Sequence, residues 1–541
     1  MKLLAGRRAG ALSGAVLLCL FLSFGPARGA ETLGKTGEDI TGEALLPDNS
    51  KAGRPLPLAA SWNAGQKPGG FSPDYQMARI GRGSHLLPWF YLPPPGWAFQ
   101  DEYYESAIKK AAKLHLPLSF LSTQWESLLG YLPQYRHLPS EINPNVRATI
   151  ARDIPELSPF GPVELWRRVG SRWTATPLLK KLQQWYPDPP LVLFISNNEQ
   201  PRLGWWEAEQ SNRFLARYGH GKSDAFKRKV IGDAWIDRYR ALQGGMREEL
   251  VTPVWKKNAR FIGFNAFGSP NFGRTGDWMR DSLYIPNRFE PWPLAWDGAS
   301  APSGVDGAPV SNSDYTVFSP QVFEMNYVFM SKEALRLNPC FWLELSVWDG
   351  HESDPSKDKR SVYASLGQVY SPGRYAGMVR FCMWLVRPRL VRDFRFWDDT
   401  VSNSGAYFMA VADSVDMIYR NPTLRRFWRF ARLVENPGRQ NPYQADIPEE
   451  YRNTGRWFLL DTSLDPPGPW TMTTTPPVFA LALVLGEQPH REWLVYAHSP
   501  LGQRDNVGIN IPEYGSITVT VGPSGNFYRV TEKNGEARPL S

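Results

Sequence analysis

The sequence predicts an α/β protein, in which a (β/α)8 TIM barrel is followed by a small C-terminal all-β sandwich domain. Three observations favour this fold class: eight short apolar runs recur along the chain, segments with helical periodicity or long loops separate most of them, and closely spaced strand-like runs follow residue 440. With 541 residues, 42% of them hydrophobic, the chain can bury such a core. We expect a signal peptide at 1–29, a linker at 30–55, the barrel at 56–440 and the sandwich at 441–541.

The first residues have the pattern of a secretory signal peptide. Lys2, Arg7 and Arg8 precede the apolar run Ala9–Phe24, and small residues up to Gly29 supply a cleavage point. Cleavage there removes four basic residues and lowers the formal net charge from +8 to +4. No lysine-rich run then remains to indicate a nucleic-acid partner. We expect an exported protein, secreted or periplasmic, with no membrane attachment after cleavage.

The barrel strands are predicted to begin after the linker, which is polar and Gly-rich and shows no periodicity. Each predicted strand is a short apolar run, and several have a proline near one end. The eight runs are Pro57–Trp62, Leu86–Leu92, Leu116–Leu121, Leu191–Ile195, Arg260–Phe264, Val317–Phe323, Cys340–Leu345 and Met378–Val386.

Three segments between these runs alternate apolar and charged residues at helical spacing and predict crossover helices: Glu102–Leu114, Val163–Trp185 and Asp224–Leu250. Eight strands with intervening helices are typical of a (β/α)8 barrel with enlarged loops. A doubly wound sheet is the alternative, but such a sheet usually carries a G-x-G-x-x-G turn after its first strand, and this chain has none there.

The last hundred residues predict the sandwich. Ala406–Val434 has the pattern of a helix, and the composition then changes to short strand-like runs separated by Gly, Pro and Asn turns. The chain has no internal repeat of the kind that indicates a propeller or solenoid.

Two predicted strands end in reactive carboxylates. In a barrel, catalytic groups lie at the carboxyl ends of the strands. Glu199 follows the fourth run in the sequence Ser-Asn-Asn-Glu-Gln, and Glu344 lies inside the otherwise apolar seventh run. A charged group in an apolar strand is costly to bury unless it has a partner or faces a cleft. Paired carboxylates from facing strands are what glycosidic bond cleavage requires.

An Asn-Glu pair at strand four and a Glu at strand seven resembles clan A of the glycoside hydrolases, which are retaining (β/α)8 enzymes. The resemblance covers roughly residues 57–435. It implies that Glu199 is the acid/base, that Glu344 is the nucleophile, and that Asn198 binds the sugar hydroxyl beside the anomeric centre. Gln200-Pro201 departs from the usual pattern, so the resemblance identifies neither the specific family nor the sugar and linkage.

Glu324 is the competing nucleophile, because it also ends an apolar run. Otherwise Glu324 is expected to hold an arginine or a sugar hydroxyl, and Asn326, which follows it, is a candidate substrate contact. Tyr327 is a candidate hydrogen-bond donor to the nucleophile, as the resemblance implies.

Aromatic residues make up 13% of the chain, including 22 Trp. A flat indole face matches the apolar face of a pyranose, while its N–H still reaches a hydroxyl. Tryptophans near the predicted strand ends, with Asn63 beside the first of them, therefore predict sugar subsites. They are Trp62, Trp89, Trp125, Trp205, Trp348 and Trp384.

Metal and cofactor chemistry is not indicated. The seven histidines are scattered, and the chain has no H-E-x-x-H, no G-x-S-x-G and no nucleotide-binding P-loop. The sequence therefore predicts a secreted retaining glycoside hydrolase acting on a poly- or oligosaccharide without a cofactor. A non-catalytic carbohydrate-binding protein on the same barrel, or an exported structural protein whose aromatics serve packing, is the alternative.

Overall fold

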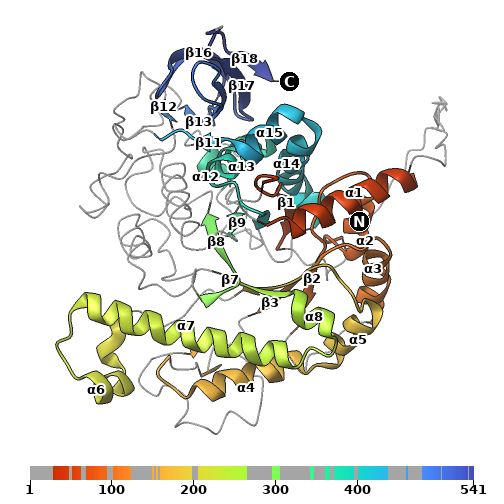
Figure 1. Cartoon of the computed structure of the whole chain (residues 1–541), viewed down its shortest axis with the longest axis vertical. Helices are drawn as coiled ribbons and strands as arrows, with labels where there is room; N and C mark the ends of the chain where they lie inside the picture. The colour runs from red at the N-terminus through yellow and green to blue at the C-terminus, as the bar shows by residue number, and fades with distance from the viewer. Residues whose placement is uncertain are drawn as a thin grey trace, which may run out of the picture.

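The computed structural model shows a sheet surrounded by helices, with a second β-rich region at the C-terminal end (Figure 1). It describes residues 29–47, 51–62, 69–93, 101–123, 149–150, 154–155, 159–197, 205–264, 295–304, 341–346, 360–365, 371–394, 400–435, 459–460, 478–500, 502–533 and 535–540.

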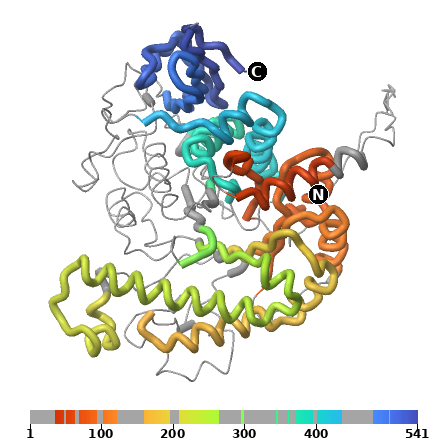
Figure 2. Tube along the Cα trace, viewed as in Figure 1, coloured from red at the N-terminus to blue at the C-terminus, as the bar shows by residue number. Residues whose placement is uncertain are grey.

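The central sheet has eight strands, and every neighbouring pair in it is parallel. From one end of the strand order to the other they are β1 (Leu58–Ser61), β10 (Leu390–Phe394), β9 (Phe341–Ser346), β8 (Gly298–Gly304), β7 (Ala259–Phe264), β6 (Val192–Asn197), β3 (Leu118–Thr123) and β2 (Trp89–Leu92). The first and last of these strands in the sequence, β1 and β10, lie side by side, which places the red and cyan parts of the chain together (Figure 2).

The two ends of this strand order also meet. Ala59 of β1 forms a parallel bridge with Leu86, just ahead of β2. The Ala59 N–H donates to the carbonyl of His85 over 3.0 Å, and the Leu87 N–H donates to the carbonyl of Ala59 over 3.0 Å. β1 therefore has hydrogen-bonded neighbours on both sides.

The helices begin at residues that suit a helix start. In α2, α5, α8 and α13 a Ser or Thr accepts a hydrogen bond from the backbone N–H three residues later, and a proline follows it. The helices are α1 (Gly29–Leu45), α2 (Pro73–Ile80), α3 (Asp101–Lys113), α4 (Val163–Thr174), α5 (Pro177–Trp185), the 3-10 helix η3 (Trp205–Gln210), α6 (Asn212–Tyr218), α7 (Asp224–Glu248), α8 (Pro253–Asn258), α12 (Arg360–Ser365), α13 (Pro372–Val386), α14 (Val401–Arg420) and α15 (Pro422–Phe430).

Two predicted helices are each divided by a proline. Val163–Trp185 forms α4 and α5, because Thr176 caps the second helix and Pro177 cannot continue the first. Asn421 in the same way caps α15 before Pro422, which separates it from α14. The predicted helices Glu102–Leu114 and Asp224–Leu250 correspond to α3 and α7.

An aromatic layer joins the sheet to its helices. Phe120, Phe194 and Phe261 are in register on β3, β6 and β7, and their rings lie 5.7 and 5.4 Å apart in succession. Trp255 of α8 stacks on Phe120, and Trp173 of α4 meets Phe194 edge to face. Because side chains alternate along a strand, the intervening residues of these strands face the opposite side of the sheet.

The helices α4 and α7 cross at two glycines. A Cβ added at Gly170 would lie 1.9 Å from the carbonyl oxygen of Leu242, and one at Gly245 would lie 1.9 Å from that of Arg167. Only glycine allows backbones to approach this closely.

The prediction of the eighth strand at Met378–Val386 is wrong. These residues belong to α13, and the strand that takes this place is β10, a few residues later. α13 packs on α14 and β9 on one side and on β13 (Phe479–Leu485) and β14 (Glu492–His498) of the C-terminal region on the other. A helix covered on all sides is apolar on all sides, so its sequence lacks helical periodicity.

The sixth strand of the sheet was also not predicted. β8 lies at Gly298–Gly304, whereas the predicted run Val317–Phe323 lies outside the described residues. β8 has the sequence GASAPSG, which lacks the β-branched and aromatic residues typical of strands. Its pairing with β7 and β9 on either side overrides that low propensity.

The predicted linker at 30–55 contains the helix α1 and is therefore wrong as a linker. Ile40 of α1 is fully buried, Thr41 donates a hydrogen bond to the carbonyl of His115 over 2.8 Å, and the Glu43 carboxylate accepts from Leu56 N–H and pairs with Arg429. The segment is rich in glycine and short polar residues, which concealed the few apolar positions that dock it.

The C-terminal region has two antiparallel sheets, and both contribute side chains to one apolar core. One sheet joins β11 (Arg432–Leu433), β13, β14, β17 (Asn526–Thr531) and β18 (Arg538–Leu540), with β12 (Leu459–Leu460) beside β13. The other pairs β15 (Arg504–Ile511) with β16 (Gly515–Val521). A short hairpin, β4 (Thr149–Ile150) with β5 (Ile154–Pro155), lies apart from both. β11 lies before residue 441, so the C-terminal sheet begins earlier than predicted.

Candidate active site

Glu344 lies in β9 and is buried, with 3% of its surface exposed. The strand register pairs it with Arg392 of β10, and Arg392 in turn pairs with Ala60 of β1. In a parallel sheet, residues in register present their side chains on the same face. Glu344 and Arg392 therefore share one face, at neighbouring strands.

The two side chains form a buried ion pair. One terminal nitrogen of Arg392 donates to a Glu344 carboxylate oxygen over 3.4 Å, and the arginine is fully buried. Burial lowers the pKa of the Arg392 guanidinium to about 10, and the Glu344 carboxylate opposes that shift. The guanidinium thus stays charged at neutral pH and favours the ionised form of the carboxylate beside it.

Trp62 completes the cluster, immediately after β1. The guanidinium carbon of Arg392 lies 4.0 Å from the centroid of the Trp62 ring system, a cation–π contact, and Trp62 is 1% exposed. Sequence analysis predicted Trp62 as a sugar-stacking residue. The structure instead places the guanidinium against its ring.

The prediction that Trp89 and Trp384 bind sugar is wrong. Trp89 is fully buried, with its ring 5.6 Å from that of Phe408 in α14. Trp384 lies in α13 between Trp428 and Phe527, with ring centroids 5.1 and 5.3 Å away. Both side chains serve packing, and the abundance of tryptophan reflects this core as well as any site.

Of the remaining predicted site residues, only Trp205 lies within the part of the chain that the structure describes. Trp205 begins the 3-10 helix η3. The others lie outside the described residues: Asn63, Trp125, Asn198, Glu199, Glu324, Asn326, Tyr327 and Trp348. β6 is described to Asn197, two residues before Glu199, and it runs parallel to β9 with β7 and β8 between them. The chain therefore leaves β6 and β9 at the same edge of the sheet.

Arg392 is the residue that sequence analysis missed. It stands in the short run Leu-Val-Arg-Asp-Phe, which follows the segment mistaken for the last strand. The available signal was an arginine next to an apolar pair shortly after a helix ends.

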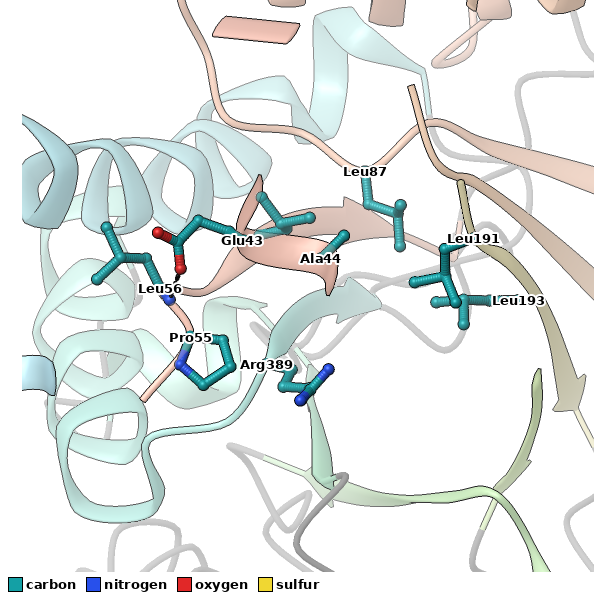
Figure 3. A pocket seen from close by; sticks show the side chains of 9 residues that line it. Glu43, Ala44, Pro55, Leu56, Leu87, Leu191, Leu193 and Arg389 are labelled. Atoms are coloured by element: carbon teal, nitrogen blue, oxygen red, sulfur yellow. Dashed lines mark hydrogen bonds between the residues drawn. The ribbon is translucent and has the colours of Figure 1, made fainter. Parts of the chain in front are cut away.

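A pocket lies at the opposite end of the sheet (Figure 3). Glu43 and Ala44 of α1 cover residues at or just before the amino ends of strands, among them Leu58, Leu87 and Leu191. Burial raises the pKa of the Glu43 carboxyl, while the Leu56 N–H and the Arg429 guanidinium oppose the shift. In parallel sheets covered by helices, ligands bind at the carboxyl ends of the strands, so this pocket is not the candidate site.

No group of three or more His, Cys, Asp or Glu residues that could hold a metal ion occurs within the described ranges. In the same part of the chain, no helix is long and apolar enough to cross a membrane.

Comparison with known proteins gives little similarity. No protein-family model matches the sequence, and no curated protein matches it. Among solved structures, the GH36 α-galactosidase AgaA of Geobacillus stearothermophilus aligns over 94% of this chain and 57% of its own, with a TM-score of 0.38 and 11% identity. The Nostoc punctiforme debranching enzyme aligns over 81% of this chain and 84% of its own, with a TM-score of 0.32 and 9% identity. This chain thus spans little more than half of that α-galactosidase. Similarities this low establish neither a shared fold nor a shared activity.

Proposed function

We propose that this protein is an exported retaining glycoside hydrolase in which Glu344 is the nucleophile and Glu199 the acid/base. The observation that carries the proposal is the Glu344–Arg392 ion pair, because a buried carboxylate paired with a guanidinium on a strand of the central sheet is suited to attack an electrophilic carbon. Glu199 follows β6, which ends at the same edge of the sheet.

The proposal includes closure of the central sheet into a (β/α)8 barrel. The all-parallel strand order and the Ala59–Leu86 bridge between its ends support closure. In such a barrel, strands from opposite parts of the sheet face a common interior, so groups on β6 and β9 can approach one substrate.

The proposed reaction has two steps. A Glu344 oxygen bonds to the anomeric carbon while the glycosidic C–O bond breaks, and the leaving oxygen takes a proton from Glu199. Water then bonds to the anomeric carbon, gives a proton to Glu199 and releases Glu344 as a carboxylate. The amide of Asn198 is proposed to bind the neighbouring sugar hydroxyl.

The substrate is proposed to be a poly- or oligosaccharide, and neither a metal nor a cofactor is needed for this chemistry. Beyond Asn198, the proposed substrate contacts are Asn63, Trp125, Trp205, Glu324, Asn326, Tyr327 and Trp348. Export in the mature form, after cleavage of a signal peptide, is part of the same proposal.

The test uses mature protein against a panel of polysaccharides and aryl glycosides. Wild-type protein should release sugar whose first-formed anomer matches the substrate, because two displacements retain configuration. Glu344→Gln should abolish turnover, and a circular dichroism spectrum like that of wild type should show that the variant is folded. Glu324→Gln is the matched comparison. If activity is lost only in Glu324→Gln, Glu324 is the nucleophile in place of Glu344. If wild-type protein binds glycans without hydrolysing them, the protein is better described as a non-catalytic carbohydrate-binding protein.

A further inference from the structure

Three side chains on adjacent strands form a continuous line of contact. The Trp62 indole lies against the Arg392 guanidinium at 4.0 Å, and the guanidinium donates to Glu344 at 3.4 Å. The strand register explains this arrangement, since Ala60, Arg392 and Glu344 are Cα partners across β1, β10 and β9, and Trp62 follows Ala60 by two residues on the same face. The line therefore follows from the backbone and not from chance side-chain rotamers.

We propose that Trp62 and Arg392 are positioning residues for the proposed nucleophile: the indole supports the guanidinium, and the guanidinium keeps the Glu344 carboxylate ionised and oriented for attack. This inference rests on the proposed function. It assigns Trp62 a role through Arg392 instead of the sugar-stacking role expected from the sequence.

The chemistry of arginine suits this role. A guanidinium is planar and carries donors in a fixed fork, so it can lie flat on an indole and still donate from its edge to a carboxylate. A lysine ammonium is a point charge on a flexible stem and cannot make both contacts with the same geometry. Full burial of Arg392 removes competing water from both contacts, which strengthens each of them.

The ion pair also affects the two chemical steps differently. When Glu344 bonds to the anomeric carbon, its carboxylate becomes a neutral ester and loses its attraction to Arg392. When the ester C–O bond breaks, the electron pair returns to Glu344 and the attraction is restored. Arg392 therefore stabilises the states before and after the covalent intermediate but not the intermediate itself. Without Arg392, the intermediate should be longer-lived relative to the free enzyme.

The first test is the pH profile of kcat/KM. An adjacent guanidinium lowers the pKa of a carboxyl group by about one to three units. Arg392→Gln should therefore move the acidic limb of the kcat/KM profile, where activity is lost as pH falls, to a pH about one unit higher or more. Arg392→Lys should recover part of this shift. Trp62→Phe, which keeps an aromatic face, should stay close to wild type, whereas Trp62→Leu should shift the limb in the same direction as Arg392→Gln. The double variant Trp62→Leu/Arg392→Gln should shift no further than Arg392→Gln alone.

Arg387→Gln is the matched control. Arg387 is also a buried arginine, just after α13, and it donates to the carbonyls of Trp428 and Ala431 away from Glu344. Its loss should lower the unfolding midpoint without moving the acidic limb. An acidic limb that does not move in Arg392→Gln would overturn the positioning role. A raised KM with an unmoved acidic limb in Trp62→Leu would overturn it too, and would indicate that Trp62 contacts the sugar.

A second measurement separates this inference from the proposed function. Urea unfolding of wild type, Glu344→Gln, Arg392→Gln and the double variant gives the coupling between the two residues without any substrate. Coupling should be present at pH 7, where both side chains are charged in the proposed arrangement. Coupling of this kind in a protein that cleaves no glycan would contradict the proposed function alone. Glycan cleavage without such coupling would contradict the positioning role alone.

Discussion

The imidazole of His85 lies flat against the phenol ring of Tyr419, with ring centroids 3.5 Å apart and planes 13° from parallel. His85 Nδ1 is 2.8 Å from an oxygen of the buried Asp416, and the same oxygen accepts the His85 backbone N–H over 2.8 Å. Because the His85 carbonyl accepts from Ala59, these contacts fix the chain where β1 meets the segment ahead of β2. Two residues of α14 thus hold together the seam of the central sheet.

Asp416→Ala should be strongly destabilising. It leaves a buried backbone N–H and a buried imidazole nitrogen of His85 without the carboxylate that they share, at an expected cost of about 2–4 kcal/mol in the free energy of unfolding. Urea unfolding followed by tryptophan fluorescence measures the change. Asp413→Ala on the exposed face of the same helix is the control and should stay within about 0.5 kcal/mol of wild type. Equal effects of the two substitutions would contradict this role of Asp416.

His498 should make the protein sensitive to acid. Burial, with a smaller contribution from the Arg374 guanidinium, lowers the pKa of His498 to about 3. An unfolded histidine binds its proton near pH 6.5, so between these values the unfolded chain holds a proton that the folded chain does not. Stability should therefore fall as pH decreases through this window, by up to about 1.4 kcal/mol per pH unit from this group.

His498→Leu should flatten that dependence between about pH 6 and pH 4. Unfolding midpoints measured across this range give the slope for each variant. His220→Gln is the control, because the His220 side chain is 77% exposed, and its slope should match wild type. A His498→Leu slope as steep as the wild-type slope would rule out His498 as the source.

The crossing of α4 and α7 should tolerate no side chain at its two contact glycines. Gly245→Ala would place a Cβ 1.9 Å from the carbonyl oxygen of Arg167, so the helices must separate, at a cost of about 3 kcal/mol. Gly244→Ala is a closely matched control on the same helix, since nothing lies within 4 Å of its added Cβ. That control should be neutral or stabilising by about 0.5–1 kcal/mol. Thermal unfolding of Gly245→Ala and Gly244→Ala measures this difference. Similar unfolding midpoints for the two variants would contradict the close approach of the helices at Gly245.

Trp384→Ala should lower stability without changing glycan affinity. Removing a fully buried tryptophan typically costs about 3–5 kcal/mol, and Trp384 packs between Trp428 and Phe527. Calorimetric titration of a glycan substrate at a temperature where the variant is folded should give a wild-type dissociation constant. A weakened constant in the folded variant would restore Trp384 as a sugar contact.

The sequence predicted most strands of the central sheet because those strands are apolar runs flanked by helices with two distinct faces. It failed at α13 for a physical reason: a helix buried between two cores shows no polar face. It also failed at β8, where pairing on both sides overrides the weak strand propensity of Gly, Ser and Pro.

The candidate site was predicted only in part. Glu344 stood out because a carboxylate in an apolar strand demands a partner, and the structure supplies Arg392. The partner itself could not be predicted, because it comes from a strand that was placed in the wrong segment. Trp62, Trp89 and Trp384 have similar sequence surroundings, and only the three-dimensional packing separates the one that contacts Arg392 from the two that fill the core.

The double coverage of α13 limits how the chain can be divided. Phe381 meets Phe479, Trp384 meets Phe527, and the Tyr496 hydroxyl donates to the Gly377 carbonyl over 2.8 Å, so one side of α13 packs against the C-terminal strands. Truncation at residue 440 would expose that apolar side of α13 to water, so the fragment should aggregate and not remain folded and monomeric. The C-terminal strands should therefore not fold as an independent domain, and a protein that borrows this sheet would also have to include α13.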